Sequence, residues 1–443
     1  MTATTIPPKA TRRERWAWYL YDFGNSAYAA VVLLAIYSAY FKGEVVGGPE
    51  GSRLWGLAIA IAMLFVAVTS PVLGAIADFS GSKKSFLLFF TSLCCVFTAT
   101  LFFVRGGDVL MGMVFFILAE IGYRSSQVFY DALLPDIAEP DEIPSVSGKG
   151  WAIGSAGGII CLLVILPLVA LIKGTFIIRL SMVITAVFFA LSSIPLFVWL
   201  RERSHHRSLP KGQTYFTIGF VRLWQTLKQA RSFSELIKFL IAFLIYNDGV
   251  IMALDFAAII GAVLFGLNQQ QLIIFVIIVQ ITNVLGAYAF GRLAESLDCK
   301  RSLILSIALM LVAVAWMFAA NQPTTFFMIG ALAGFAMAGV QSVSRSLVGV
   351  ATPPERSAEF YGFFAVAGRT SSFIGPAVYG WVAAEAARWY HTGGQASELA
   401  EKSGQRLAIL SIGAFLLVGM LLLLLFNEVR ARAAARSVRL ESS

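Results

Sequence analysis

The feature that most constrains this chain is a succession of apolar runs, each about 20 residues long and separated by short polar breaks. A helix needs about 20 apolar residues to cross roughly 30 Å of hydrocarbon, so each run is long enough to span a membrane. The 443 residues are 58% hydrophobic and only 13% charged, which lies outside the usual balance of soluble domains. The sequence therefore predicts an all-α membrane protein.

Hydropathy predicts twelve transmembrane helices, six in each half of the chain. In the first half they are expected at residues 16–41, 54–77, 86–104, 110–130, 150–171 and 176–200. In the second half they are expected at residues 233–264, 272–293, 303–320, 326–350, 360–384 and 407–426. Basic residues precede the first run as in a signal peptide, but that run is too long and lacks a small-residue cleavage site, so we expect a retained helix.

Most Lys and Arg residues outside the spans lie in segments that face the cytoplasm if the N-terminus is inside. The positive-inside rule then places both termini in the cytoplasm of a bacterial inner membrane, and it explains the formal charge of +9 without nucleic acid. The longest connection, 201–232, carries seven basic residues and separates an N-terminal half, 1–200, from a C-terminal half, 233–443. Its apolar residues at helical spacing predict an amphipathic helix on anionic lipid, the alternative being a solvated linker.

The two halves share an internal repeat. The loop after the second span contains Gly74, Asp78, Lys83 and Lys84, and the loop after the eighth contains Gly291, Glu295, Lys300 and Arg301 at the same spacing, 217 residues later. The same offset superposes Gly122 and Ser125 on Gly339 and Ser342, and a slightly larger one sets Tyr21 and Gly24 against Tyr246 and Gly249. Parallel repeats of this kind predict a two-lobed transporter.

The first loop, with Gly81 included, matches Gly-x-x-x-Asp-x-x-Gly-x-Lys/Arg-Lys/Arg, so the chain resembles the major facilitator superfamily. The stretches YDFGNSAY (21–28), FYDALLPDI (129–137), SGKGWAIG (147–154), SRSLVG (344–349) and GFFAVAGRTSSFIGP (362–376) are similar to the branch of autophagy-related vacuolar amino-acid effluxers and their bacterial relatives. The chain departs from those relatives at Phe23 and Gly24, where they often have Trp-Ala. The resemblance implies the major facilitator fold, amino-acid efflux, and alternating access about a site near the bilayer midplane.

Seven charged residues fall inside predicted spans, namely Asp22, Glu120, Arg124, Asp248, Asp255, Arg345 and Arg369. Each costs about 2.5 to 3.5 kcal/mol near the bilayer centre, so we expect these side chains to face one another or a water-filled cavity. Most lie on the first, fourth, seventh and tenth spans, which in the resembled superfamily line the central cavity.

The candidate substrate or proton site comprises Asp22, Asn25, Tyr28, Glu120, Arg124, Asn247, Asp248 and Arg369. The alternative for the aspartates is that they only join helices by hydrogen bonds, worth about 0.6 kcal/mol each. Glu120 and Arg124, spaced i and i+4, either neutralise each other or hand over a proton, since protonating the Glu frees the Arg. The repeated loops are the candidate cytoplasmic gate. We expect the negative charge of Asp78 to neighbour the positive N-terminus of the eleventh span near Ala358, and Glu295 to do likewise with the fifth span near Gly148.

Other classes of protein find no support in the sequence. The four cysteines, Cys94, Cys95, Cys161 and Cys299, have no metal-ligand or redox spacing, and there is no phosphate-binding loop or catalytic cluster. We therefore expect a monomeric secondary transporter without metal or cofactor, with a small zwitterionic solute, protons and membrane lipid as its partners. A transport-dead receptor or scaffold of the same fold is the alternative, although it would not need charges at membrane depth.

Overall fold

The computed structural model describes residues 10–46, 48–172, 174–203, 233–267 and 269–442. Every element in these ranges is helical. The amphipathic helix expected within 201–232 lies outside the described residues from residue 204 onward. The chain divides into two compact units, and each is described by itself.

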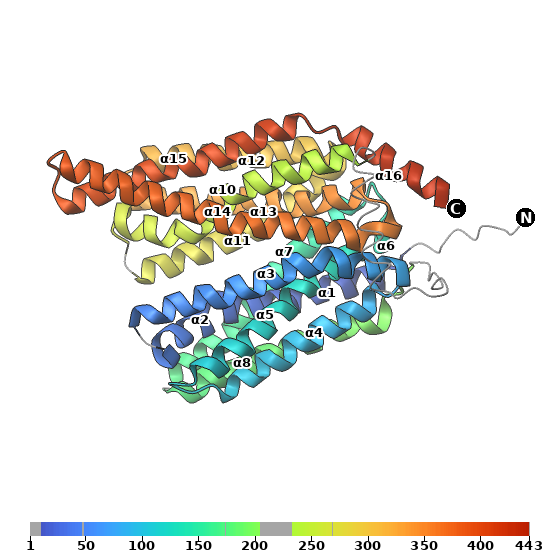
Figure 1. Cartoon of the computed structure of the whole chain (residues 1–443), viewed down its shortest axis with the longest axis horizontal. Coiled ribbons are helices and arrows are strands. Elements are labelled where there is room, and N and C mark those ends of the chain that lie inside the picture. Colours follow the sequence, from blue (N-terminus) through green and yellow to red (C-terminus); the bar gives the residue numbers. More distant parts are fainter. Residues whose placement is uncertain (1–9, 47, 173, 204–232, 268, 443) are drawn as a thin grey trace, which may run out of the picture. The chain divides into compact units, whose positions relative to one another are not determined.

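The first unit comprises Met1–Lys228 together with Thr352–Phe363. Its helices run side by side (Figure 1), with α1 against α7 and α8, α4 against α5 and α8, and α3 against α5. They are α1 (Arg12–Tyr28), α2 (Tyr37–Tyr40), α3 (Gly48–Ser80), α4 (Lys83–Thr100), α5 (Val109–Ala132), α6 (Leu134–Ile137), α7 (Ile143–Leu171) and α8 (Thr175–Trp199). Short helical turns η1 (Ala29–Ala35), η2 (Phe41–Val46) and η3 (Leu101–Phe103) join some of them.

The second unit comprises Gln229–Ala351 and Phe364–Ser443. Here α10 packs on α15, α11 on α13, and α12 on both α13 and α15. The helices are α10 (Ser234–Phe265), α11 (Gln269–Ser296), α12 (Cys299–Ala319), α13 (Pro323–Ala351), α14 (Ser357–Thr392), α15 (Ser397–Leu424) and α16 (Glu428–Ser442). The turn η4 (Pro354–Arg356) and the first residues of α14 belong to the first unit, whereas the rest of α14 belongs to the second.

Ten helices among the described residues are long and apolar enough to cross a membrane. The predicted spans 16–41 and 360–384 are not among these ten. The first is divided between α1, the π-helical turn η1 and α2, and the second lies in α14, where Gly, Ser, Thr and Arg residues lower the hydropathy. Helices α14 and α15 also extend beyond the predicted spans, to Thr392 and from Ser397. The architecture is that of an all-α membrane protein.

The repeat predicted from sequence reappears as repeated helix contacts. In the first unit a Cβ added to Gly150 would collide with Trp18, and one added to Gly157 would collide with the Phe23 backbone, so α7 lies directly on α1. Small residues allow such close approach of helices in membranes.

In the second unit a Cβ on Gly368 would lie 3.3 Å from Phe243, and one on Gly375 would lie 2.9 Å from Asp248. These contacts join α14 to α10 at the positions equivalent to those that join α7 to α1, so the two helix pairs pack in the same way.

Candidate functional site

Helix α1 places the first three candidate residues on one face. Asp22, Asn25 and Tyr28 are spaced three residues apart, which keeps them on neighbouring turns, and their exposed fractions are 8%, 2% and 1%. A capping box at Thr11 fixes where the helix begins. The α-helical pattern ends at Tyr28, where the wider π-helical turn η1 follows, a feature often found at functional sites.

Helix α5 supplies the candidate ion pair. Arg124 Nε lies 2.7 Å from Glu120 Oε1, and the two residues are four positions apart on one helix face. Glu120 is fully buried, whereas 26% of the Arg124 side chain is exposed. The carboxylate of this ion pair is therefore shielded from solvent, whereas part of the guanidinium side chain is accessible.

Tyr123 connects these two helices, and the sequence analysis did not single it out. Its ring stacks on Tyr28 with the ring centroids 4.6 Å apart. The hydroxyl of Tyr123 lies within electrostatic reach of Asp22, Glu120 and Arg124. The signal available in the sequence was its spacing, three residues after Glu120 and beside Arg124. The first unit thus brings its charged candidates together around a pair of tyrosines.

Several polar atoms in this cluster have no hydrogen bond within the described part of the chain. They are Asn25 Oδ1, the Tyr28 hydroxyl and Glu120 Oε2, and all are shielded from solvent. The Tyr28 hydroxyl lies close enough to the Glu120 carboxylate to interact with it, although the contact is looser than an ordinary hydrogen bond. Buried polar groups without partners cost about 1 to 3 kcal/mol each, so this arrangement is suited to a bound solute or proton.

In the second unit, Asn247 and Asp248 lie on α10 and are 3% and 1% exposed. Asn247 Oδ1 accepts a hydrogen bond from Gln341 Nε2 at 3.1 Å. Asp248 Oδ1 accepts one from the Gly375 backbone N–H at 2.9 Å, whereas Asp248 Oδ2 is buried without a hydrogen bond from any described residue. The side chain of Arg369 lies outside the described part of the structure, so its expected role stays a prediction.

The loop after α3 makes the contact that its charge predicted. Asp78 Oδ2 accepts a hydrogen bond from the Glu359 backbone N–H at 2.8 Å, in the first turn of α14. A carboxylate is stabilised there by the positive end of the helix. A Cβ on Gly74 would collide with the Ala358 backbone, so only glycine permits this approach.

Lys83 lies at the centre of this contact and is fully buried. Its ammonium is 3.5 Å from Asp78 Oδ1 and 3.7 Å from Asp136 Oδ2, and it donates to Ser357 Oγ at 2.7 Å. Asp136 and Ser357 were not among the predicted gate residues. Asp136 lies within the FYDALLPDI stretch, which was the one available signal. The buried charges are thus paired, as burial requires.

The second loop follows α11 with a different register. Lys84 and Lys300 are equivalent because each joins its loop to the end of another helix. Lys84 Nζ donates a hydrogen bond to the Leu200 carbonyl at the end of α8. Lys300 Nζ donates one to the Leu424 carbonyl at the end of α15. Glu202 accepts from the backbone N–H groups that begin α4, and Glu428 does the same at the start of α12.

The structural repeat is therefore offset by 216 residues at this point, not by the 217 of the sequence match. Cys299, and not Lys300, stands where Lys83 stands, and Cys299 is fully buried. Arg301 instead forms a 3.3 Å ion pair with Asp298. In this loop Gly291 is buried and Glu295 is exposed.

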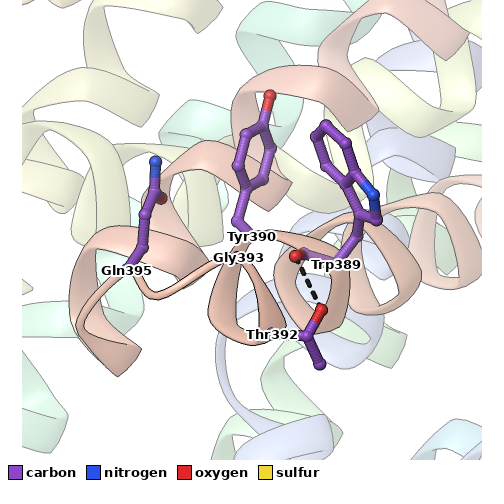
Figure 2. Close-up of a pocket in the computed structure, with 5 residues that line it drawn as sticks. All are labelled: Trp389, Tyr390, Thr392, Gly393 and Gln395. Atoms are coloured by element: carbon purple, nitrogen blue, oxygen red, sulfur yellow. Dashed lines mark hydrogen bonds between the residues drawn. The ribbon is translucent and has the colours of Figure 1, made fainter.

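No group of described His, Cys, Asp and Glu residues is arranged to hold a metal ion. A surface hollow of about 380 Å³ lies at the turn between α14 and α15. Figure 2 shows Trp389, Tyr390 and Gln395 beside one another at its rim. None of its five lining residues is charged, and none belongs to the candidate site.

Comparisons with known proteins show which family the chain resembles. The family described as "Vacuole effluxer Atg22 like" matches residues 55–436. The MFS-type transporter YxiO of Bacillus subtilis is 30% identical over 378 residues, which cover 83% of this chain and 87% of that protein. Autophagy-related protein 22 of Coccidioides immitis is 24% identical over 398 residues, covering 72% of this chain and 66% of that protein. This chain thus spans just under two thirds of that fungal relative.

Solved structures show the same fold at low sequence identity. The human organic anion transporter MFSD10 superposes with a TM-score of 0.70 and 15% identity over 94% of this chain and all of that one. The proton:xylose symporter XylE gives a TM-score of 0.68 and 12% identity over 94% of this chain and 95% of that one. This chain therefore belongs to the Atg22-like family of major facilitator superfamily transporters.

Proposed function

We propose that this protein is a secondary transporter of small zwitterionic solutes, with amino acids as the substrate class, working by alternating access. The observation that carries the proposal is the cluster in the first unit, where the Arg124 guanidinium lies 5.1 Å from the centre of the Tyr123 ring and the Asp22 carboxylate lies within electrostatic reach of the Tyr123 hydroxyl. An α-amino acid carries charges of both signs a few ångströms apart. A carboxylate and a guanidinium near one tyrosine match that charge pattern.

In this proposal Asp22 receives the substrate ammonium and Arg124 receives the carboxylate. A Cβ on Gly154 would lie 2.8 Å from the Asp22 carboxylate, so α7 offers only a glycine there and leaves room for that side chain. In the second unit, Asp248 with its unpaired Oδ2 is a second candidate for the ammonium, and Arg369 is a second candidate for the carboxylate.

The alternative role of these charges is to hold helices together. Polar side chains that hold helices together have hydrogen-bond partners in the neighbouring helix. In this cluster, by contrast, three buried atoms lack a hydrogen bond from the described residues, namely Asn25 Oδ1, the Tyr28 hydroxyl and Glu120 Oε2. A transport-dead receptor would have no reason to maintain such groups at membrane depth, where each charge costs about 2.5 to 3.5 kcal/mol. The arrangement therefore favours a site that a solute completes.

Binding assays on the full-length protein in lipid nanodiscs test this proposal with a panel of amino acids. Each is compared with its amide, which lacks the carboxylate, and with its deamino analogue, which lacks the ammonium. We expect Asp22→Asn and Arg124→Gln each to weaken binding by about 2 to 5 kcal/mol, because each leaves a buried charge of the substrate unpaired.

The two variants should also change specificity differently. Arg124→Gln should no longer prefer the amino acid over its amide, and Asp22→Asn should no longer prefer it over the deamino analogue. Asp141→Asn and Arg105→Gln, at exposed positions in loops, are the matched controls. If Arg124→Gln keeps the native preference for the carboxylate, Arg124 does not bind it.

A further inference from the structure

Asp248 is a buried carboxylate whose charge has no counter-ion among the described residues of the second unit. It lies within the apolar stretch Ser234–Ala257 of α10 and is 1% exposed. Among the described residues, only the Gly375 backbone N–H donates a hydrogen bond to it, at Oδ1, and no basic side chain acts on it electrostatically. Oδ2 is buried without a partner. Buried charges are normally paired or bound to a metal ion, so this carboxylate is suited to hold a cation.

Helix α14, which contacts Asp248, has an unusual hydrogen-bond pattern at the same level. In an α-helix each N–H donates to the carbonyl four residues earlier. The Gly375 N–H, whose regular acceptor is the Ser371 carbonyl, donates to Asp248. The next residue, Pro376, has no N–H, so the Ser372 carbonyl lacks its regular donor. A helical carbonyl oxygen lies about 3 Å from the nitrogen four residues later, so these two oxygens lie close to the Gly375 N–H and hence to the carboxylate.

The first unit lacks both features at the equivalent positions. Gly157 contacts the Phe23 backbone as Gly375 contacts Asp248, so Phe23 occupies the position of Asp248 in the repeat. Gly158 follows Gly157, whereas a proline follows Gly375. The carboxylate and the proline therefore occur together in one unit, which indicates that they serve one site.

The charge and the ligand types determine which cation fits. One carboxylate balances one positive charge, so a monovalent ion leaves no net charge in the apolar stretch, whereas a divalent ion leaves one. Carboxylate and carbonyl oxygens are ligands of hard cations. In transporters, backbone carbonyls of interrupted helices coordinate Na⁺ at membrane depth. An ionised carboxylate is a ligand of high field strength, which favours the smaller Na⁺ over K⁺.

We infer that Asp248 Oδ2 and the carbonyl oxygens of Ser371 and Ser372 form a sodium-ion site between α10 and α14. The site lies entirely within the second unit. It does not depend on the proposed amino-acid substrate, but it changes how that substrate binds. With Na⁺ on Asp248, the substrate ammonium is left to Asp22, and Na⁺ is the coupling ion of transport.

Binding of radioactive Na⁺ to the full-length protein in nanodiscs tests this site. The measurement is made at about pH 8, where carboxylates are ionised, with choline chloride keeping the ionic strength constant and no amino acid present. The native protein should bind Na⁺ saturably, and K⁺ should compete at least about tenfold more weakly. Asp248→Asn should lose the saturable binding, whereas Asp141→Asn, at an exposed loop position, should match the native protein.

Pro376→Ala tests the carbonyl ligands, because alanine supplies an N–H for the Ser372 carbonyl. We expect its Kd for Na⁺ to rise by about three- to tenfold, since one oxygen ligand is then engaged in a hydrogen bond. Its unfolding temperature in choline chloride should equal or exceed the native value, because a proline is removed from a helix interior. This variant keeps the inference testable if Asp248→Asn does not fold.

The inference is overturned if the native protein shows no saturable Na⁺ binding or binds K⁺ equally well. Unchanged Na⁺ affinity in either Asp248→Asn or Pro376→Ala overturns it too. Arg369, whose side chain lies outside the described residues, is tested by Arg369→Gln. If Na⁺ binds only to that variant, Arg369 is the counter-ion of Asp248 and the sodium site is wrong.

Amino acids separate this inference from the proposed function. If an excess of amino acid displaces Na⁺ competitively, the ammonium occupies Asp248 and the sodium site is wrong. If Na⁺ binds as expected and no amino acid binds to the protein, only the proposed function fails.

Discussion

At the scale of single residues, the first helix is anchored by one carboxylate. Glu14 accepts hydrogen bonds from the backbone N–H groups of Thr11 and Arg201 and from the guanidinium of Arg203. Burial by itself would raise the pKa of Glu14, but these donors outweigh it and lower the pKa to about 2. Glu14 therefore joins the start of α1 to the end of α8.

We expect Glu14→Gln to lower the free energy of unfolding by about 1 to 3 kcal/mol at pH 7, because buried donors lose a charged acceptor. The pKa of Glu14 in the folded protein is below its ordinary value of 4.5, so the stabilisation is complete above pH 4.5 and is lost as the pH falls towards about 2. Thermal unfolding in detergent across this range should show the difference between native and variant disappearing with acid. Glu401→Gln, at an exposed position, is the control and should match the native protein at each pH.

At the scale of elements, the loop from α3 to α4 is joined to the beginning of α14. Asp78 accepts from the Glu359 backbone, and Lys83 pairs with Asp78 and Asp136 while donating to Ser357. The first turn of α14 belongs to the first unit, although the rest of that helix does not. We propose that this contact is a cytoplasmic latch, which has to open when the halves rearrange.

We predict that Asp78→Asn weakens the latch by about 1.5 to 3 kcal/mol, the range for a hydrogen bond to a charged group. Transport into proteoliposomes should slow several-fold while expression stays normal, and cysteines on the cytoplasmic side should become easier to label. Glu295→Gln, in the repeated loop, is the matched variant; its side chain is exposed, and we expect a smaller effect. Unchanged transport and unchanged labelling in Asp78→Asn would contradict the latch.

At the scale of the whole molecule, the two units join the ends of their helices with equivalent pairs of carboxylates. Glu14 accepts from the Arg201 N–H, and Glu235 accepts from the Asn427 N–H. The residues that follow in the chain, Glu202 and Glu428, cap α4 and α12. One ancestral arrangement repeated twice accounts for this, as expected for parallel repeats.

The topology prediction belongs to this scale. With both termini in the cytoplasm, a cysteine at Arg105 or Thr392 should be labelled from outside the cell and one at Lys211 should not. Arg105 and Thr392 are exposed, so a cysteine there can be labelled. The neighbouring turn residues Gly107 and Gly394 are not used, because their positive φ values of 90° and 93° disfavour cysteine. The background lacks the four native cysteines, and labelling at Lys211 from outside would reverse the predicted orientation.

The sequence by itself determined the membrane class, the repeat and most of the spans, because the length of an apolar run and its lack of charge are local properties. It also identified Asp22, Glu120 and Asp248 as unusual, since a charge at membrane depth is costly wherever the helix lies. The contact of Asp78 with the start of α14 could be predicted, because a negative carboxylate is stabilised by the positive N-terminal end of a helix.

Only the tertiary structure decided which of these groups meet. In the sequence, Tyr123 resembles any aromatic core residue, and only the structure shows its ring stacked on Tyr28. Asp136 likewise becomes a candidate gate residue only through its ion pair with Lys83, 53 positions away in the chain. The register of the second loop also depended on packing, because the backbone N–H groups that Glu428 caps place Cys299, and not Lys300, where Lys83 stands. Contacts between helices depend on rotation and sliding of whole elements, and those are set by side chains distant in sequence, which a local pattern does not contain.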